Sequence, residues 1–294
     1  MDDQQLLAEQ FEQHRTRLRA LAYRMLGSIT EADDAVQEAW LRLSRSDADA
    51  IENLAGWLTT VVSRLCLNVL RSRTARREDL LDPHVPDPIV TVEGTLDPEE
   101  EAMLADAVGV ALLVVLETLT PAERLAFVLH DTFAVPFDQV AAVLGRSSEA
   151  TRQLASRARR RVRGATTPPD ADVARQRAAV DAFFAAARAG DFEGLVAVLD
   201  PEVVARSDGG ARRPQLSRVT SGAAAVAGQA LTYANPAAEL RPALVNGAAG
   251  VVVMLAGRPQ TIMGFTVVDG RIVAINALVD PDRIAELDLA AFTG

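Results

Sequence analysis

The chain has 294 residues, of which 49 % are hydrophobic and 24 % are charged, so it is not a disordered protein and we expect two or three domains. The net charge of −10 argues against indiscriminate nucleic-acid binding. The single cysteine, Cys66, excludes an internal disulfide and a cysteine zinc site. With no membrane span or signal peptide in the sequence, we expect a cytoplasmic protein without metal or cofactor.

The first helical region extends over residues 11–77, and a break at Gly27-Ser28 divides it. Thr30 is the predicted N-cap of the helix that follows this break, and Asn53 begins another helix. Three prolines and a change of composition then predict a linker, before a further helix over residues 96–119.

The charge of the chain is concentrated in three segments. Residues 64–77 contain five arginines and no acid, residues 78–106 contain ten acids and no base, and residues 146–163 contain seven arginines and one acid. Each run alone is explained by a solvated helix face. Together they favour a DNA-binding protein whose acidic segment is a mobile tether that can shield its own basic helices.

The strongest local signal lies in residues 137–163. Residues 137–144 predict a short helix, Gly145 a tight turn, and Ser147 the N-cap of a second helix. The inward stripe of that second helix is Thr151, Leu154, Ala158 and Val162, and its opposite face carries Ser148, Glu149, Arg152, Gln153, Ser156, Arg159 and Arg160. This layout predicts a helix-turn-helix in which Arg152 and Gln153 reach base edges in the major groove. The alternative is a plain pair of surface helices.

The last third of the chain changes character from helical to mixed. A helix over residues 173–189 precedes valine- and isoleucine-rich strands, with a hairpin turn at Asp269-Gly270. We therefore predict five parts: a helical domain over 1–77, an acidic linker with prolines over 78–106, a helix-turn-helix domain over 107–165, a linker over 166–172, and an α+β domain over 173–294.

Residues 21–43, 54–78 and 119–163 together resemble the two conserved domains of extracytoplasmic-function RNA polymerase sigma factors. The C-terminal part resembles a SnoaL-like domain, a cone-shaped α+β barrel, and this combination is known in the SigJ-type group. That group has a Trp-Leu-Pro-Glu-Pro linker motif, which here corresponds to residues 84–88 (His-Val-Pro-Asp-Pro). Its Asp-Gly-Gly-Gly-Lys and Asn-Pro-Asp-Lys motifs correspond to residues 208–212 and 280–283.

The resemblance implies an alternative sigma factor, and not an enzyme, with core RNA polymerase and promoter DNA as partners. Polymerase contacts would involve a largest-subunit coiled coil and the flap; an anti-sigma protein is possible but not required, and no membrane is expected. The coiled coil would bind Asp34, Gln37 and Glu38. The minus-ten element would be bound by Asn53, Trp57, Arg64, Asn68, Arg71 and Arg73, and the minus-thirty-five element by the second helix of the helix-turn-helix.

The resemblance also implies that the C-terminal domain contacts both sigma domains and modulates their activity in cis. The residues implied in this regulation are Asp208, Gly209, Gly210, Arg212, Asp280, Pro281, Asp282 and Arg283. The three aspartates would pair with arginines of the sigma domains.

Two other functions stay open at the level of sequence. One is a ligand-responsive DNA-binding regulator, against which the first 77 residues argue, since a repressor needs no polymerase-docking helix. The other is a SnoaL-like cyclase or isomerase fused to a DNA-binding module. Residues 131–294 contain no histidine or cysteine, and Asp208, a lone candidate acid, adjoins a Gly-Gly turn.

Overall fold

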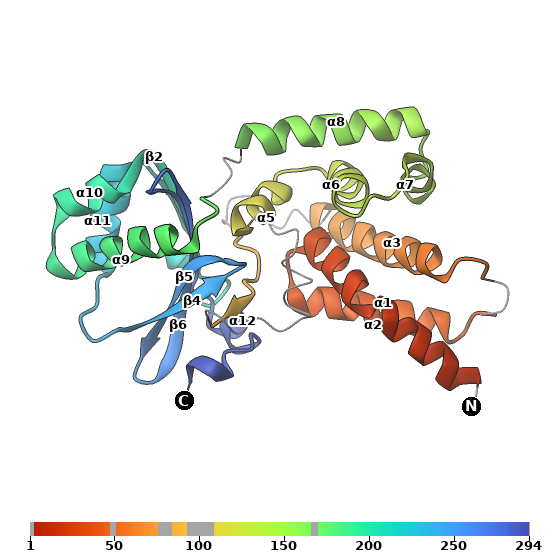
Figure 1. Cartoon of the computed structure of the whole chain (residues 1–294), viewed down its shortest axis with the longest axis horizontal. Helices are drawn as coiled ribbons and strands as arrows, with labels where there is room; N and C mark the ends of the chain where they lie inside the picture. The colour runs from red at the N-terminus through yellow and green to blue at the C-terminus, as the bar shows by residue number, and fades with distance from the viewer. Residues whose placement is uncertain (1–2, 48–50, 76–83, 93–108, 166–169, 294) are drawn as a thin grey trace. The chain divides into compact units, whose positions relative to one another are not determined.

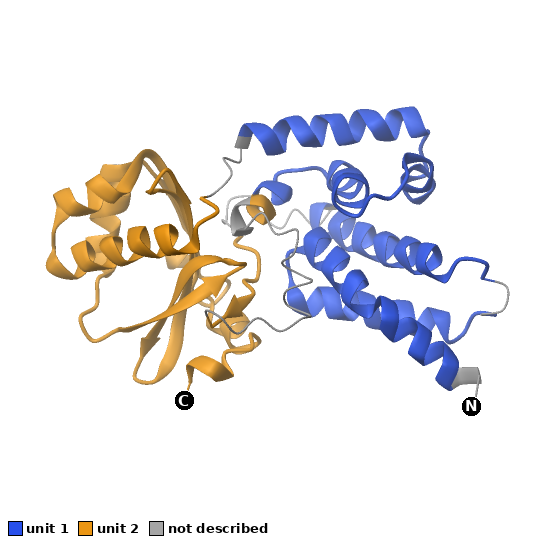
Figure 2. Cartoon of the chain, viewed as in Figure 1, with its two compact units in different colours: residues 1–78, 98–106, 115–166 blue, residues 79–97, 107–114, 167–294 orange. Residues whose placement is uncertain are grey.

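The structure is a computed structural model that describes residues 3–47, 51–75, 84–92, 109–165 and 170–293. Two compact units make up the chain (Figure 2). The first contains residues 1–78, 98–106 and 115–166, and the second contains residues 79–97, 107–114 and 167–294. Arg76, Arg77, most of the predicted acidic linker and residues 166–169 lie outside the described residues.

The first unit begins with three helices, which Figure 1 shows in red and orange: α1 (Asp3–Leu26), α2 (Ile29–Leu43) and α3 (Leu54–Ala75). Their apolar faces form one core that includes Phe11, Leu21 and Leu58. The predicted cap of α2 was wrong by two residues, because Ser28 has the extended backbone of an N-cap and its hydroxyl accepts from the Glu31 N–H. Asn53 begins α3, where its Oδ1 accepts from the Gly56 N–H at 3.0 Å.

The helix-turn-helix follows in the same unit. Its two helices are α7 (Phe137–Leu144) and α8 (Ser148–Ala165), and α6 (Pro121–Phe127) and a π-helical turn (Val128–Thr132) precede them. The helix α5 (Gly109–Glu117) comes before α6, and only its residues from 115 on belong to this unit. Gly145 adopts a φ of +65°, which lets the chain turn tightly between α7 and α8. Residues 96–108 of the predicted helix over 96–119 lie outside the described residues.

The two helical groups of the first unit contact each other through Arg124, which is only 2 % exposed. Its Nε donates to the Arg24 carbonyl oxygen at 3.2 Å, and its Nη1 binds Glu117 Oε1 at 2.9 Å. Arg17 Nη2 donates to the Phe133 carbonyl oxygen in the same region. A buried arginine with these partners joins α6 to α1 within the unit.

The second unit is a curved sheet with helices. Its elements are β1 (Val90–Thr91), α9 (Val173–Ala189), α10 (Phe192–Val198), β2 (Leu199–Asp208), β3 (Arg218–Ser221), α11 (Ala223–Tyr233), β4 (Glu239–Val245), β5 (Ala248–Leu255), β6 (Arg258–Val268), β7 (Arg271–Leu278) and α12 (Pro281–Ala285). The seven strands follow the order β1-β4-β5-β6-β7-β2-β3, and β2 is parallel to β7. The remaining pairs are antiparallel, including the predicted hairpin at Asp269-Gly270.

Side chains of alternate residues build a core on each face of this sheet. Phe265 and Ile275 face a core shared with helices α9, α10 and α11. Ile262 and Leu278 belong to a second core, which includes Ile284 of α12 and Val90 of β1. The expected succession of two helical domains and an α+β domain is therefore confirmed.

Residues 84–92 do not form the mobile tether that their charge and prolines predicted. Residues 85–91 are buried in the second unit, where β1 pairs with the edge strand β4. Ile89 exchanges hydrogen bonds with Asn246, from its N–H to Oδ1 and from the Asn246 N–H to its carbonyl oxygen, both at 2.8 Å. Burial of Val85, Ile89 and Val90 outweighs the acidic character of the segment.

Candidate functional site

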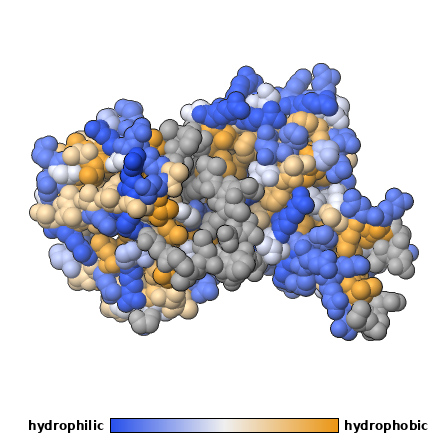
Figure 3. All heavy atoms as spheres, in the orientation of Figure 1, coloured by the Kyte–Doolittle hydropathy of each residue, from blue (hydrophilic) through white to orange (hydrophobic). Residues whose placement is uncertain are grey.

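The helix α8 has one buried face and one exposed polar face. The predicted inward stripe, Thr151, Leu154, Ala158 and Val162, is buried. Glu149, Arg152, Gln153, Ser156 and Arg160 of the predicted DNA-binding face are exposed, whereas Ser148 and Arg159 are half-buried. Hydrophilic side chains follow α8 along the upper edge of the view in Figure 3. Arg152 also lies over the Phe137 ring, 5.5 Å from its centroid.

Three arginines of α8 bind carboxylates of the first unit. Arg157 and Arg161 contact the buried carboxylate of Glu123 at 3.0 and 2.9 Å, and Arg159 contacts Asp131 at 2.6 Å. Burial alone would raise the pKa of Glu123, but hydrogen bonds from Arg157 and Thr120 and the charge of Arg161 lower it below its ordinary value. Arg157 and Arg161 therefore hold α8 against α6, and Arg159 holds it against the π-helical turn. Arg152 and Arg160 have no carboxylate partner among the described residues.

On α3, the predicted minus-ten residues form a stripe that follows the helical repeat. Trp57 is half-buried, and Arg64, Asn68 and Arg71 are exposed at intervals of seven, four and three residues. Arg73 differs from the residues of this stripe because its side chain is bound within the unit. It binds the Glu31 carboxylate and donates to the Leu26 carbonyl oxygen at 3.0 Å. Its side chain therefore links α3 to α2.

On α2, the predicted polymerase-binding residues share one polar face. Asp34 and Gln37 are exposed, and Glu38 binds Arg42 one turn later at 2.9 Å. Leu41 lies on the same face and is 38 % exposed. Leu41 was not among the residues predicted from the sequence, although an apolar residue within a polar stripe is visible there.

In the second unit, Arg283 of α12 binds two carboxylates and a carbonyl oxygen. Its Nε and Nη1 lie 2.7 Å from Asp87 Oδ1 and Asp208 Oδ2, and its Nη2 donates to the Val85 carbonyl oxygen at 2.6 Å. Asp208 Oδ2 also accepts from the Val85 N–H at 2.9 Å. We call Arg283, Asp208, Asp87 and Val85 the Arg283 cluster. It joins the end of β2 and the start of α12 to residues 84–92.

The carboxylate of Asp208 is held in its ionised form. Burial alone would raise its pKa, but hydrogen bonds from His84 and the Val85 N–H, with the charge of Arg283, lower the pKa from 3.8 to about 2. His84 Nδ1 lies 3.4 Å from Asp208 Oδ2. The carboxylate is thus a structural anion in the Arg283 cluster.

The other implied regulatory residues surround this cluster. Gly210 has a φ of +58°, and a side chain there would overlap the Asp280 carboxylate, so glycine is required. Asp280 caps α12 by accepting from the Asp282 N–H at 3.0 Å, and Pro281 occupies the first turn. Arg212 and Asp282 form an exposed ion pair at 3.0 Å, while Gly209 is buried at the turn after β2.

The pairing of Asp208, Asp280 and Asp282 with arginines of the helical domains, which the resemblance implied, stays a prediction. Asp208 and Asp282 bind arginines of their own unit, and Asp280 is a helix cap. The motifs at residues 208–212 and 280–283 contact residues 84–88, the third motif that the resemblance implied. Sequence reasoning missed Asn246, which hydrogen-bonds Ile89 and which reads as an ordinary turn residue before Gly247.

Comparison with known proteins identifies the two helical groups. The sequence matches Sigma-70 region 2 over residues 10–76 and Sigma-70, region 4 over residues 109–162. It is 40 % identical over 295 residues to "ECF RNA polymerase sigma factor SigJ" of Mycobacterium tuberculosis, a match that covers 93 % of this chain and 92 % of the relative. The chain belongs to the ECF RNA polymerase sigma factors.

Other comparisons extend this likeness to the whole sigma factor. It is 37 % identical to "Probable ECF RNA polymerase sigma factor SigI" of Mycobacterium tuberculosis, over 93 % of each chain. The crystal structure of Mycobacterium tuberculosis SigJ superposes with a TM-score of 0.75 at 36 % identity, covering 96 % of this chain and 99 % of that one. Both comparisons include the C-terminal α+β domain.

As an alternative sigma factor, the protein directs transcription initiation with core RNA polymerase at promoter DNA. Region 2 contains α1–α3, and region 4 contains α5–α8 up to residue 162. Residues 84–92, which the second unit binds, are part of the chain that joins the two regions. None of the described helices combines the length and the hydropathy needed to span a membrane.

Proposed function

We propose that the C-terminal domain modulates this sigma factor in cis by holding residues 84–92 of the connection between regions 2 and 4. The observation that carries the proposal is the Arg283 cluster, in which Arg283 binds Val85, Asp87 and Asp208. Buried ion pairs of this kind are costly to break, since removal of one partner leaves the others uncompensated. The cluster therefore favours a lasting attachment.

Binding of this segment changes the connection between the two regions. The chain between α3 and α5 is divided by residues 84–92 into stretches of eight residues (76–83) and sixteen residues (93–108). A shorter connection restricts the separation of its ends and raises their effective concentration. Since both promoter elements must be bound at a fixed spacing, such a restriction changes the output of the sigma factor.

The exposed faces of the first unit supply the contacts with promoter and polymerase in this proposal. The exposed face of α8 reads the minus-thirty-five element, with Arg152 and Gln153 at base edges. The stripe of Trp57, Arg64, Asn68 and Arg71 binds the minus-ten strand by stacking and charge. Asp34, Gln37 and Glu38 dock on the coiled coil of the largest polymerase subunit, and exposed Leu41 adds an apolar contact. Region 4 binds the flap, and an anti-sigma protein is not required.

Catalysis is not part of the proposed function. Asp208, the acid that a SnoaL-like enzyme would use in this chain, is engaged by Arg283, His84 and Val85. Residues 131–294 contain no histidine or cysteine that would replace it as an acid, base or nucleophile. The domain is therefore proposed as a regulator.

In vitro transcription with core RNA polymerase tests regulation in cis. The full chain is compared with Arg283→Ala, with a chain that ends after Leu278, and with a chain that ends after Thr167. Partial release by the first two changes should raise transcription, and complete removal of the domain should lower it, since the held segment then loses its support. Arg271→Ala, which removes an exposed arginine of the same domain outside the Arg283 cluster, is the matched control. Identical transcription by all five proteins would overturn the proposal.

A further inference from the structure

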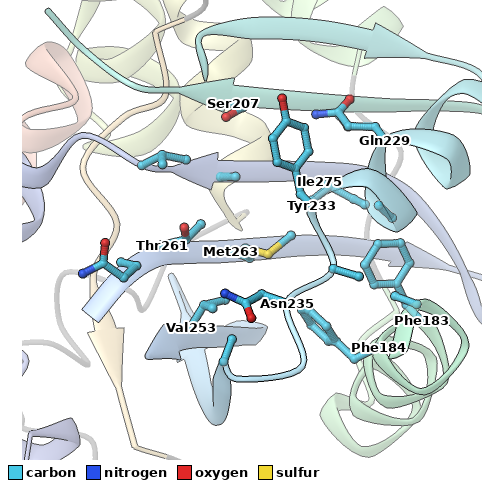
Figure 4. Close-up of a pocket in the computed structure, with 18 of the residues that line it drawn as sticks. Phe183, Phe184, Ser207, Gln229, Tyr233, Asn235, Val253, Thr261, Met263 and Ile275 are labelled. Carbon is cyan, nitrogen blue, oxygen red and sulfur yellow. The ribbon is translucent and has the colours of Figure 1, made fainter. Parts of the chain in front are cut away.

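A cavity of about 360 Å³ lies in the C-terminal domain and is lined by the sheet and by helices α9 and α11. Figure 4 shows Phe183, Phe184, Tyr233, Met263 and Ile275 around it, from helices α9 and α11 and strands β6 and β7. The volume falls within the range of about 300–1,000 Å³ of pockets for small organic ligands. Its walls are mostly apolar, as such sites require.

The charge of the cavity wall has one sign. Among the described residues that line it none is acidic, whereas Arg188, Arg206 and Arg218 are basic. Arg206 alternates with Ala205 and Ser207 along β2, so its side chain belongs to the opposite face of the sheet. Arg188 is exposed, in the last turn of α9. A cavity without carboxylates and with basic residues on its wall favours an anionic ligand.

Arg218 has the best-defined position of these arginines. It lies on β3 directly opposite Ser207, so the two side chains share the face that lines the cavity. Its guanidinium lies 5.2 Å from the Tyr233 ring centroid, and its Nη2 donates to the Gln215 carbonyl oxygen at 2.9 Å. A guanidinium has five N–H donors, so these contacts leave donors for a ligand.

Two hydroxyl groups of the wall are also available. The side chains of Ser207 and Thr261 line the cavity, and neither makes a hydrogen bond with a partner among the described residues. Gln229, by contrast, is bound by Thr220. An apolar ligand with one polar end would satisfy such groups without leaving a buried polar atom unpaired.

We propose that this cavity binds an amphipathic organic acid, with its apolar body against Phe183, Phe184 and Met263 and its carboxylate toward Arg218 and Ser207. The proposal is one of ligand binding, since the described residues that line the cavity offer one guanidinium and two hydroxyl groups to a carboxylate. The ligand site is independent of whether the domain regulates the sigma factor in cis.

Nuclear magnetic resonance of the full chain labelled in its methionine methyl groups tests the site. Each of two probes, 2-naphthoate and decanoate, is compared with its uncharged amide. The chain has five methionines, and Met263 lines the cavity, whereas Met254 belongs to the core on the other face of the sheet and Met25 to the first unit. The Met263 signal should shift with at least one acid, which should bind about tenfold more tightly than its amide through a charge-assisted hydrogen bond.

Arg218→Gln should remove the preference for the acid. Arg271→Gln changes an exposed arginine that is not among the described residues lining the cavity, and it should retain the preference. Ala230→Trp should place an indole ring in the cavity and abolish the Met263 shift with both acid and amide. The wild-type Met263 shifts carry the test if this variant does not fold. The proposal is overturned if neither acid shifts the Met263 signal at millimolar concentration. It is equally overturned if acid and amide bind alike, or if Arg218→Gln and Arg271→Gln behave alike.

Discussion

The exposed face of α8 and the Arg283 cluster use the same side chain in opposite ways. Arg152 and Arg160 are exposed, and among the described residues no carboxylate binds them. The side chain of Arg283 is only 20 % exposed, and it binds two carboxylates that are 8–9 % exposed. An exposed, unpaired guanidinium keeps its attraction for phosphates and bases, whereas a buried, paired one fixes structure. The surroundings of an arginine, and not its presence in the sequence, therefore decide whether its side chain is available to a ligand or is used to hold the fold.

The largest effect is expected from removal of the buried arginine, Arg283. Arg283→Ala leaves Asp87 and Asp208 buried without their partner, so the free energy of unfolding of the C-terminal domain should fall by about 3–5 kcal/mol. Urea unfolding followed by the Met254 methyl signal measures this. Arg212→Ala, the control, removes an exposed pair and should cost about 0–1 kcal/mol. Equal losses in the two variants would show that the Arg283 cluster does not hold the domain.

Acid should weaken the same cluster through Asp208. Its pKa in the folded protein, about 2, is below the ordinary 3.8, so the ionised carboxylate stabilises the fold fully above the ordinary value. This contribution, about 2–3 kcal/mol, is lost as the pH falls through 3.8 toward 2. Urea unfolding of wild type and Asp208→Asn at pH 5.5 and pH 2.5 should show that the variant lacks this part of the acid dependence. Parallel pH dependence in both proteins would contradict the assignment.

Arg152→Ala removes one of the exposed arginines of α8. If Arg152 pairs with a base edge, its removal should cost about 1–3 kcal/mol at that base pair and relax the choice of base there. Transcription from promoters with each base at every position of the minus-thirty-five element, using core polymerase, measures the loss. Unchanged promoter choice would show that Arg152 does not read a base.

The helix-turn-helix and the α+β character of the last third were predictable, because their signals are local. Gly145, Ser147 and the stripe of Thr151, Leu154 and Ala158 lie within one stretch of sequence whose periodicity fixes both helices. Ser28 was missed as a cap because Thr30 is an equally good capping residue by type. Local chemistry alone does not choose between two such neighbours.

The Arg283 cluster was only partly predictable. The resemblance implied its residues, but not that Asp208 and Arg283 bind residues 84–92. Arg283 and Asp87 are 196 residues apart in sequence, and Ile89 and Asn246 are 157 apart. Likewise, the sequence contains seven arginines in residues 146–163, but it does not show which of them are paired. Only the fold shows that Arg157 and Arg161 bind Glu123. Long-range pairing decides which charges are free.

The smallest effects are expected for Arg159 and Arg160, which are neighbours on α8 with different surroundings. Arg160 is exposed, whereas Arg159 is half-buried and binds Asp131 at 2.6 Å. A free guanidinium that contacts a phosphate releases a counterion on binding, so Arg160→Ala should weaken all promoter sequences alike and reduce the salt slope by about 1.

Arg159 is already neutralised by its partner, so Arg159→Ala should reduce the salt slope by less than Arg160→Ala. The slopes come from binding of the holoenzyme to promoter DNA over a series of salt concentrations. Asp131→Ala then releases the Arg159 guanidinium and should steepen the slope relative to wild type, since a freed cation adds to the charge that faces the DNA. If Arg159→Ala and Arg160→Ala reduced the slope equally, pairing with Asp131 would not withhold Arg159 from the DNA. The distinction between free and paired arginines would then not extend to the surface of α8.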